Sequence, residues 1–274
     1  MKYLGTRAIL LGGIFSLFFI TGLFAQDAAD APSAASLYND GLEKAKAKEY
    51  VEALSLMEQA IELATAEEND QVIRLAKANG TRAAYGAGVE HRKAEEYDKA
   101  LAAFEKGIEF KPDFYTNYVG KAQVLEAQDK LAEAVTGYLK AAEVATAADK
   151  ADKAEQFEKK TIAIMAKELV DDDFDQTQAC AEAYLAVQES AEAHYYLGSA
   201  LKAKGDLSKA VEHLDKACEM AGNDEDKSKY YYVKGQTHEA LGQTDSAIAA
   251  FKMVTDAKYK ENAQYKVNEL EGGR

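Results

Sequence analysis

Four histidines are the first candidates for acid–base or metal chemistry in this sequence of 274 residues: His91, His194, His213 and His238. Such chemistry needs titratable side chains that converge on one point and support each other. His91 and His238 hold equivalent places in two similar segments, which favours a packing role over a catalytic one. His194 and His213 have no Cys, Asp or Glu at metal-ligand spacing. The histidines are therefore expected not to converge, and they predict neither a catalytic site nor a metal site.

The run DDDFD matches part of the sequence pattern of a calcium-binding loop. Four carboxylates fall at its first, third, fifth and twelfth positions: Asp171, Asp173, Asp175 and Glu182. Gln176 stands where that loop requires glycine for its sharp turn. The run is better interpreted as an acidic helix start, which complements the helix dipole.

A second short motif, YGAG at 85–88, has the glycines of a phosphate-binding loop. It falls inside an expected helix, and the lysine of such a loop does not follow it. Neither motif predicts a cofactor. No nucleophile or acid–base pair has a supporting partner, so the sequence does not indicate an enzyme.

Two cysteines, Cys180 and Cys218, allow two interpretations. In an exported chain they could form a disulfide, which needs Cα atoms within about 7 Å of each other. Alternatively, both are small apolar residues that fill space on successive second helices. The spacing leaves both interpretations open.

The elements that would position these residues follow a helix-turn-helix pattern with a period of about 34 residues. It is plainest in YGAGVEHRKAEEYDKALAAFEKGIEFKP (85–112) and HYYLGSALKAKGDLSKAVEHLDKAC (194–218). In the first of these, Gly88 and Ala100 are small, so that two antiparallel helices can approach closely. Phe104, four residues after Ala100, supplies apolar volume on the inward face.

Six copies of this pattern are expected near 34–67, 81–114, 115–148, 158–191, 191–224 and 228–261. The fourth copy departs most from the pattern, because Met165 and Thr177 replace small residues. Extra residues before the second and fourth copies are helix-forming and predict lengthened helices. Residues 261–270 predict a final helix that caps the last apolar face.

These positions resemble the tetratricopeptide repeat (TPR) family over residues 34–270. The resemblance implies an all-α, right-handed α-solenoid of about six repeats, acting as a non-enzymatic scaffold that binds another protein or peptide in its concave groove. Family members that grip a chaperone tail use paired Lys and Asn residues. Here the matching positions hold Tyr38, Leu42 and Gly86, so that clamp is not expected.

The groove-facing position of the family pattern holds a tyrosine in four of the copies: Tyr38, Tyr85, Tyr195 and Tyr232. Each could bury its ring against a bound peptide and form one hydrogen bond with it. Four cations at other groove-facing positions could receive acidic side chains: Arg82, Arg92, Lys202 and Lys229. The alternative is that the tyrosines are ordinary packing residues.

The amino terminus reads as an export signal over residues 1–25. Lys2 and Arg7 precede an apolar run, and Ala25 is the expected last residue before cleavage. Leu23 is large for its place in a cleavage site, so a retained anchor helix is the alternative. Residues 26–33 are expected to be a disordered lead. The sequence thus predicts an exported bacterial protein of the periplasm or cell envelope whose mature chain does not enter the membrane.

The formal net charge of −14 argues against nucleic acid or an anionic lipid surface as the partner. Two other functions stay open beside the scaffold. One is a module that binds a glycan or small peptide, although the absence of tryptophan counts against sugar stacking. The other is a structural protein that self-associates through its last repeat and capping helix.

Overall fold

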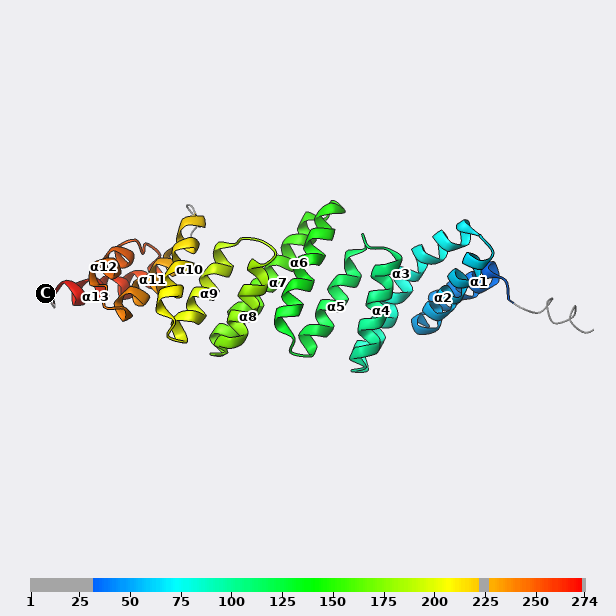
Figure 1. Cartoon of the computed structure of the whole chain (residues 1–274), viewed down its shortest axis with the longest axis horizontal. Coiled ribbons are helices and arrows are strands. Elements are labelled where there is room, and N and C mark those ends of the chain that lie inside the picture. Colours follow the sequence, from blue (N-terminus) through cyan, green and yellow to red (C-terminus); the bar gives the residue numbers. More distant parts are fainter. Residues whose placement is uncertain (1–31, 222–226, 273–274) are drawn as a thin grey trace, which may run out of the picture.

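The computed structural model describes residues 32–221 and 227–272. Over these residues the chain forms thirteen α-helices and no strand, arranged as an elongated stack (Figure 1). The predicted all-α solenoid is confirmed. The expected signal peptide, its cleavage site and most of the expected lead lie outside the described residues. None of the described helices combines the length and apolar character needed to span a bilayer.

The helices form six pairs followed by one final helix. We call the first helix of each pair the A helix and the second the B helix. The pairs are α1 (Ala34–Lys46) with α2 (Tyr50–Ala66), α3 (Asp70–Lys93) with α4 (Tyr97–Phe110), α5 (Tyr115–Ala127) with α6 (Leu131–Ala147), α7 (Ala151–Val170) with α8 (Phe174–Leu185), α9 (Ala191–Ala203) with α10 (Leu207–Met220), and α11 (Lys227–Ala240) with α12 (Thr244–Lys252); α13 (Ala257–Gly272) follows.

The extra residues before the second and fourth copies behave differently from each other. Residues 70–80 are helical and continuous with the rest of α3, as expected of a lengthened helix. Before the fourth copy, residues 148–150 form the turn between α6 and α7, and only the residues from Ala151 onward lengthen α7. The final helix begins at Ala257, four residues before the expected range.

Every turn from an A helix to its B helix has three residues, and the middle residue of each has a positive φ angle. Glycine provides this conformation without steric cost at Gly205 and Gly242. In the other four turns a residue with a side chain takes it: Lys48, Glu95, Asp129 and Asp172. The short turns hold each helix pair close together and present these four side chains to solvent at one end of the pair.

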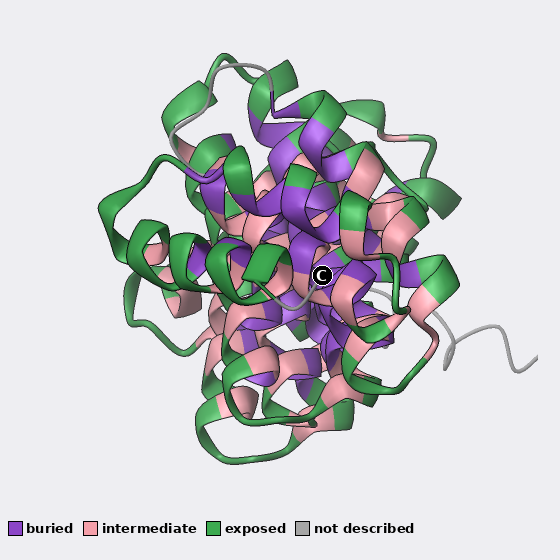
Figure 2. Ribbon diagram, turned by 90° about the vertical axis from the view of Figure 1, so that its left-hand side faces the viewer, coloured by how far each residue is buried: buried purple, intermediate pink, exposed green. Residues whose placement is uncertain are grey.

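The core of the second pair confirms the predicted register of small and large residues. Ala100 and Phe104 are completely buried. A Cβ atom on Gly88 would lie 2.7 Å from the Phe104 ring, and a Cβ on Gly120 of α5 would overlap the same ring. Phe104 therefore fills a slot that exists because two neighbouring helices carry glycine there. In the end-on view, such buried residues run through the middle of the stack (Figure 2).

One step of the stack is built differently from the others. Successive A helices have Cα atoms within 8 Å of each other at every step except from α5 to α7, where none do. Successive B helices meet in this way only from α6 to α8. Because the inner side of a bend is the side on which neighbouring helices lie closest, the local bend is reversed between the third and fourth pairs.

The departures in the fourth copy explain this reversed step. Met165 of α7 is completely buried where a small residue would let α8 approach α7 closely. The small residues Cys180 and Ala181 of α8 instead join the apolar cluster that contains Val135 and Tyr138 of α6. Bulk on α7 and small side chains on the α6-facing side of α8 thus bring the two B helices together.

Candidate binding groove

The four predicted groove tyrosines fall into two separate sections of the stack, because the reversed step lies between them. Tyr38 and Tyr85 lie on α1 and α3, and Tyr195 and Tyr232 lie on α9 and α11. These four tyrosines therefore do not follow one another on successive A helices with the same contacts. Val119, which occupies the same position on α5, packs against the core cluster shared by the third to fifth pairs.

The two carboxyl-terminal tyrosines pack against other aromatic rings, both within their own helix pair and across to the next helix pair or α13. The Tyr195 ring centroid lies 5.0 Å from that of Tyr196 and 5.2 Å from that of Tyr230. The Tyr232 ring lies 5.8 Å from Phe251 and 5.5 Å from Tyr259 by the same measure. Both tyrosines are half-buried. The packing interpretation left open by the sequence accounts for these two rings.

The two amino-terminal tyrosines differ from each other. The Tyr38 hydroxyl accepts a hydrogen bond of 3.1 Å from Asn79 Nδ2 and so links α1 to α3. Tyr85 has 38% of its surface exposed, although one side of its ring contacts Phe104 at a centroid distance of 6.0 Å. Of the four tyrosines, Tyr85 thus presents the most ring surface to a ligand.

Two of the predicted groove cations bind partners within the chain. Lys229 forms an ion pair of 2.8 Å with Glu192 and lies 5.3 Å above the rings of Tyr195 and Tyr230. Lys202 donates a hydrogen bond of 2.7 Å to Gln236, and burial lowers the pKa of its ammonium group. These lysines hold neighbouring A helices together. The sequence spacing could not reveal this, because the partners come from the adjacent repeat.

The two arginines lie on opposite sides of Tyr85 along α3. Arg92 is half-buried in the last turn, and its Nε atom has no hydrogen-bond partner among the described residues. Arg82 is exposed, and within the described parts of the chain it makes no ion pair. Of the four predicted cations, Arg82 is the one that lines the same surface hollow as Tyr85.

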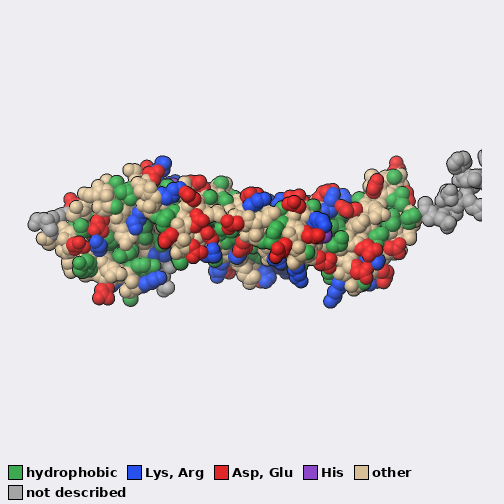
Figure 3. Space-filling model, turned by 90° about the horizontal axis from the view of Figure 1, so that it is seen from below, with side chains coloured by type: hydrophobic (Ala, Val, Ile, Leu, Met, Phe, Trp, Pro, Cys, Tyr) green, Lys and Arg blue, Asp and Glu red, His purple; other side chains and the backbone are tan. Residues whose placement is uncertain are grey.

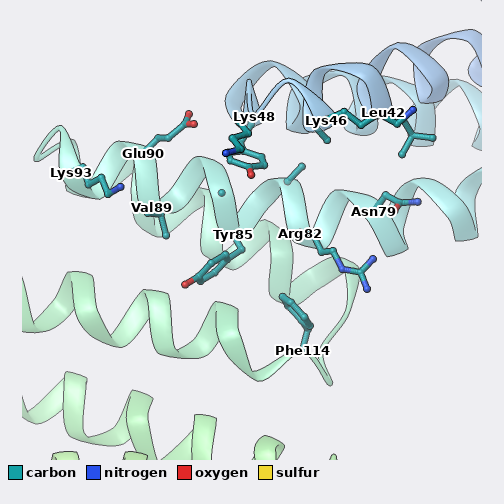
Figure 4. Close-up of a pocket in the computed structure, with 14 residues that line it drawn as sticks. Leu42, Lys46, Lys48, Asn79, Arg82, Tyr85, Val89, Glu90, Lys93 and Phe114 are labelled. Carbon is teal, nitrogen blue, oxygen red and sulfur yellow. The ribbon is translucent and has the colours of Figure 1, made fainter. Parts of the chain in front are cut away.

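That hollow, the α1–α3 groove, has a volume of about 790 Å³. It is lined by Leu42, Ala45, Lys46, Lys48, Tyr50, Asn79, Arg82, Ala83, Tyr85, Gly86, Val89, Glu90, Lys93 and Phe114. Figure 4 shows Lys46 and Lys48 on the α1–α2 side of the groove, and Arg82 and Tyr85 projecting from α3 in different directions, with Phe114 nearer to Arg82. Gly86 helps to form this groove, because any Cβ atom at this position would overlap the Tyr50 ring.

His91 and His238 have equivalent structural roles. His91 Nδ1 lies 2.6 Å from Glu96 Oε2, and His238 Nδ1 lies 2.7 Å from Gln243 Oε1. Each contact joins the end of an A helix to the residue that precedes its B helix. The same geometry recurs where Lys44 donates to Glu49 at 2.7 Å. Each of these histidines therefore connects the end of its A helix to the turn that leads into the B helix.

The expectation that the histidines do not converge is wrong for His194 and His213. Their Nδ1 atoms lie 2.9 Å apart, which requires a proton on one of the two nitrogens, and His194 Nε2 lies 2.7 Å from Glu189 Oε2. His194 is 2% exposed. Among the described residues no group of three or more His, Cys, Asp or Glu side chains could hold a metal ion. The pair instead joins α9 to α10.

This histidine pair predicts a loss of stability in mild acid. Burial, followed by the charges of His194 and Lys216, lowers the pKa of His213 below its ordinary value of 6.5. As pH falls from 6.5 through the lowered folded-state pKa, the unfolded chain binds more protons than the folded chain, so the free energy of unfolding decreases. Urea unfolding midpoints between pH 8 and pH 5 measure this. The His213→Gln variant should show a shallower decrease, and equal slopes for the two proteins would contradict the prediction.

The aspartate run begins a helix, as the sequence indicates. The Asp173 side chain accepts a hydrogen bond of 3.0 Å from Gln176 N at the start of α8, and Asp172 occupies the positive-φ position of the turn. Asp175 forms an ion pair with Lys204 of the α9–α10 turn. The carboxylates thus cap a helix and pair with a lysine.

Both cysteines are free and buried, so the interpretation as apolar filling describes them. Burial raises the pKa of Cys180 to about 12 and that of Cys218 to about 11, which keeps both thiols protonated and unreactive.

We expect both cysteines to react slowly with iodoacetamide in the native protein and fully in denaturant. An exposed Ser36→Cys variant should provide one fast-reacting thiol. Rapid native labelling of the parent chain would contradict this packing.

Comparison with protein families identifies the repeats. Tetratricopeptide repeat models match residues 74–152, 191–224 and 228–260, which together make up just over half of the chain. The chain belongs to the tetratricopeptide repeat family. Proteins of this family are in general non-enzymatic scaffolds that bind other proteins or peptides. No curated protein matches the sequence.

Several solved structures are similar to parts of this chain. YrrB, described as a TPR protein with an unusual peptide-binding site, is 21% identical, with 62% of this chain and 83% of that chain covered and a TM-score of 0.40. MamA is 18% identical, with 70% and 92% covered and a TM-score of 0.35. The TPR protein TTC0263 of Thermus thermophilus is 15% identical, with 87% and 98% covered and a TM-score of 0.30. These likenesses concern the fold alone.

Proposed function

We propose that this protein is a non-enzymatic scaffold of the bacterial cell envelope, which holds a segment of another polypeptide in the α1–α3 groove. Family membership supports a role in binding proteins. The apolar run between Ile9 and Phe24, preceded by Lys2 and Arg7, supports export.

The observation that carries the proposal is the combination of half-exposed rings and unpaired charge in one hollow. Tyr85, Tyr50 and Phe114 offer aromatic surface around a groove of about 790 Å³. Arg82 adds hydrogen-bond donors at its edge. Aromatic rings with a few polar groups around a hollow are the usual means of binding a short peptide segment.

Site-specific photo-crosslinking in the native host tests this proposal. A photoreactive phenylalanine analogue placed at Tyr85 should capture a polypeptide, which mass spectrometry would identify. The same analogue at Val170, which is 80% exposed at the end of α7, is the matched control and should not capture that polypeptide. A host protein captured equally at both positions, or none at Tyr85, would count against the groove.

Two measurements distinguish the scaffold from the ligand-binding module and from the self-associating structural protein. A retained sugar or small peptide in the native mass spectrum, without a crosslinked protein, would favour the ligand-binding module. A dimer mass by light scattering, with crosslinks between copies, would favour self-association. Export and cleavage after Ala25 are tested by the amino-terminal sequence and cell fraction of the native protein.

A further inference from the structure

We propose that the α1–α3 groove selects an acidic segment that carries one apolar or aromatic residue. This inference rests on the proposed function and specifies the chemistry of the partner. The protein as a whole carries 47 acidic and 33 basic residues, so a hollow with mainly positive charge on its rim is unusual for it.

The rim of the groove carries four cations, Lys46, Lys48, Arg82 and Lys93, and one carboxylate, Glu90. Lys46 is paired with Glu43 at 2.6 Å. Within the described residues, Lys48, Arg82 and Lys93 have neither an ion pair nor a hydrogen bond from their side chains, and all three are exposed. Since desolvating these cations requires a compensating anion, a ligand that enters the groove is expected to supply carboxylates.

This surplus of charge is local. In α11, by contrast, two lysines are neutralised within the chain, Lys229 by Glu192 and Lys234 by Asp215. Figure 3 shows acidic side chains interspersed with basic ones along one face of the molecule. Charge complementarity therefore directs an acidic segment to the first two pairs rather than to the carboxyl-terminal pairs.

The floor of the groove explains the need for an apolar residue. Leu42, Tyr50, Val89 and Phe114 are only half-buried although they are large, and no described part of the chain covers them. Burying an apolar side chain against them contributes about 25 cal/mol for each Å² removed from water. A ligand with carboxylates alone would leave this apolar surface in contact with water. An acidic segment that also carries an apolar residue is therefore expected to bind the groove more tightly.

The test uses the whole chain and fluorescein-labelled peptides, with binding followed by anisotropy. The probe has glutamates flanking one phenylalanine in a Gly-Ser background. One matched peptide has glutamine for each glutamate, and another has serine for the phenylalanine. We expect the probe to bind more tightly than either matched peptide, and added salt to weaken its binding.

The protein variants test the location. Lys48→Glu, Arg82→Glu and Lys93→Glu combined should weaken binding at least about tenfold. A glutamate is compatible with the backbone at position 48, since Glu68 and Glu95 occupy positive-φ turn positions in this chain. The matched control changes to glutamate three exposed lysines that likewise have no ion pair in the described part of the chain: Lys150, Lys216 and Lys260. It alters the net charge equally and should bind like the parent.

The outcomes separate this inference from the proposed function. If the glutamine peptide binds as tightly as the probe, or both variants bind alike, the acidic preference is wrong. When crosslinking at Tyr85 nevertheless captures a polypeptide, the scaffold proposal stands without this inference. If the peptides show no acidic preference and crosslinking at Tyr85 captures no polypeptide, both this inference and the proposed function are wrong.

Discussion

Replacing Phe104 by alanine is expected to lower the free energy of unfolding by about 3–5 kcal/mol. The ring is completely buried and lies against Gly88 of α3 and Gly120 of α5. Since neither glycine has a side chain that could move into the vacated space, the cavity should persist. Urea unfolding followed by circular dichroism measures the loss.

Phe110→Ala is the matched control for this cavity. Phe110 is on the same helix but only half-buried, with Lys106 Nζ 5.9 Å from its ring centroid. The same chemical change should therefore cost clearly less there. If Phe104→Ala lowers stability by less than Phe110→Ala, the assigned packing of α3, α4 and α5 is wrong.

Replacing Asn117 by aspartate is expected to lower the free energy of unfolding by about 3–5 kcal/mol at pH 7, the usual cost of an unpaired buried charge. Asn117 is completely buried at the start of α5. Its Nδ2 donates to the carbonyl oxygen of Thr81 at 3.3 Å and to Thr81 Oγ1 at 3.0 Å. Thr81 Oγ1 in turn donates to the Gly107 carbonyl at 2.8 Å. A carboxylate would place negative charge against these oxygens.

The pH dependence of this variant identifies the cause. Burial should raise the folded-state pKa of the introduced carboxyl above its unfolded value of about 3.9. The variant is therefore closest to the parent near pH 4, and the difference grows as pH rises through the folded-state pKa. Thr81→Val, which breaks the same network without adding charge, should cost about 1–3 kcal/mol with no such dependence. A pH-independent defect in Asn117→Asp would contradict the burial of charge.

The repeat architecture could be predicted because it depends on residue size at fixed spacing. The pattern has two small residues, Gly88 and Ala100, followed by the large Phe104. This spacing indicates two closely packed antiparallel helices. The same register contained a signal that was missed. Gly198 and Ala210 face each other, so residues four before and three after them, His194 and His213, must also meet. Extending the helix register from Gly198 and Ala210 to the histidines would have predicted the contact between His194 and His213.

The groove was only partly predictable. Tyr85 and Arg82 could be placed from the family pattern, whereas Lys48, Lys93 and Phe114 come from a turn, a helix end and a connecting segment outside that pattern. The pairing of Lys202 and Lys229 depends on side chains of the next repeat. A partial signal was available, since Lys48 takes a positive-φ position that projects from the turn. Nothing in the spacing indicated that Met165 would reverse the step between the third and fourth pairs.

That reversed step has a mechanical consequence. If every step bent the same way, the stack would curve throughout its length and bring its two ends closer together. Because the single step at α6 and α8 bends the other way, it offsets part of the curvature of the steps on either side, and the stack is straighter than one whose steps all bend alike. A straighter stack keeps its first and last helix pairs farther apart than a fully curved stack with the same number of helices.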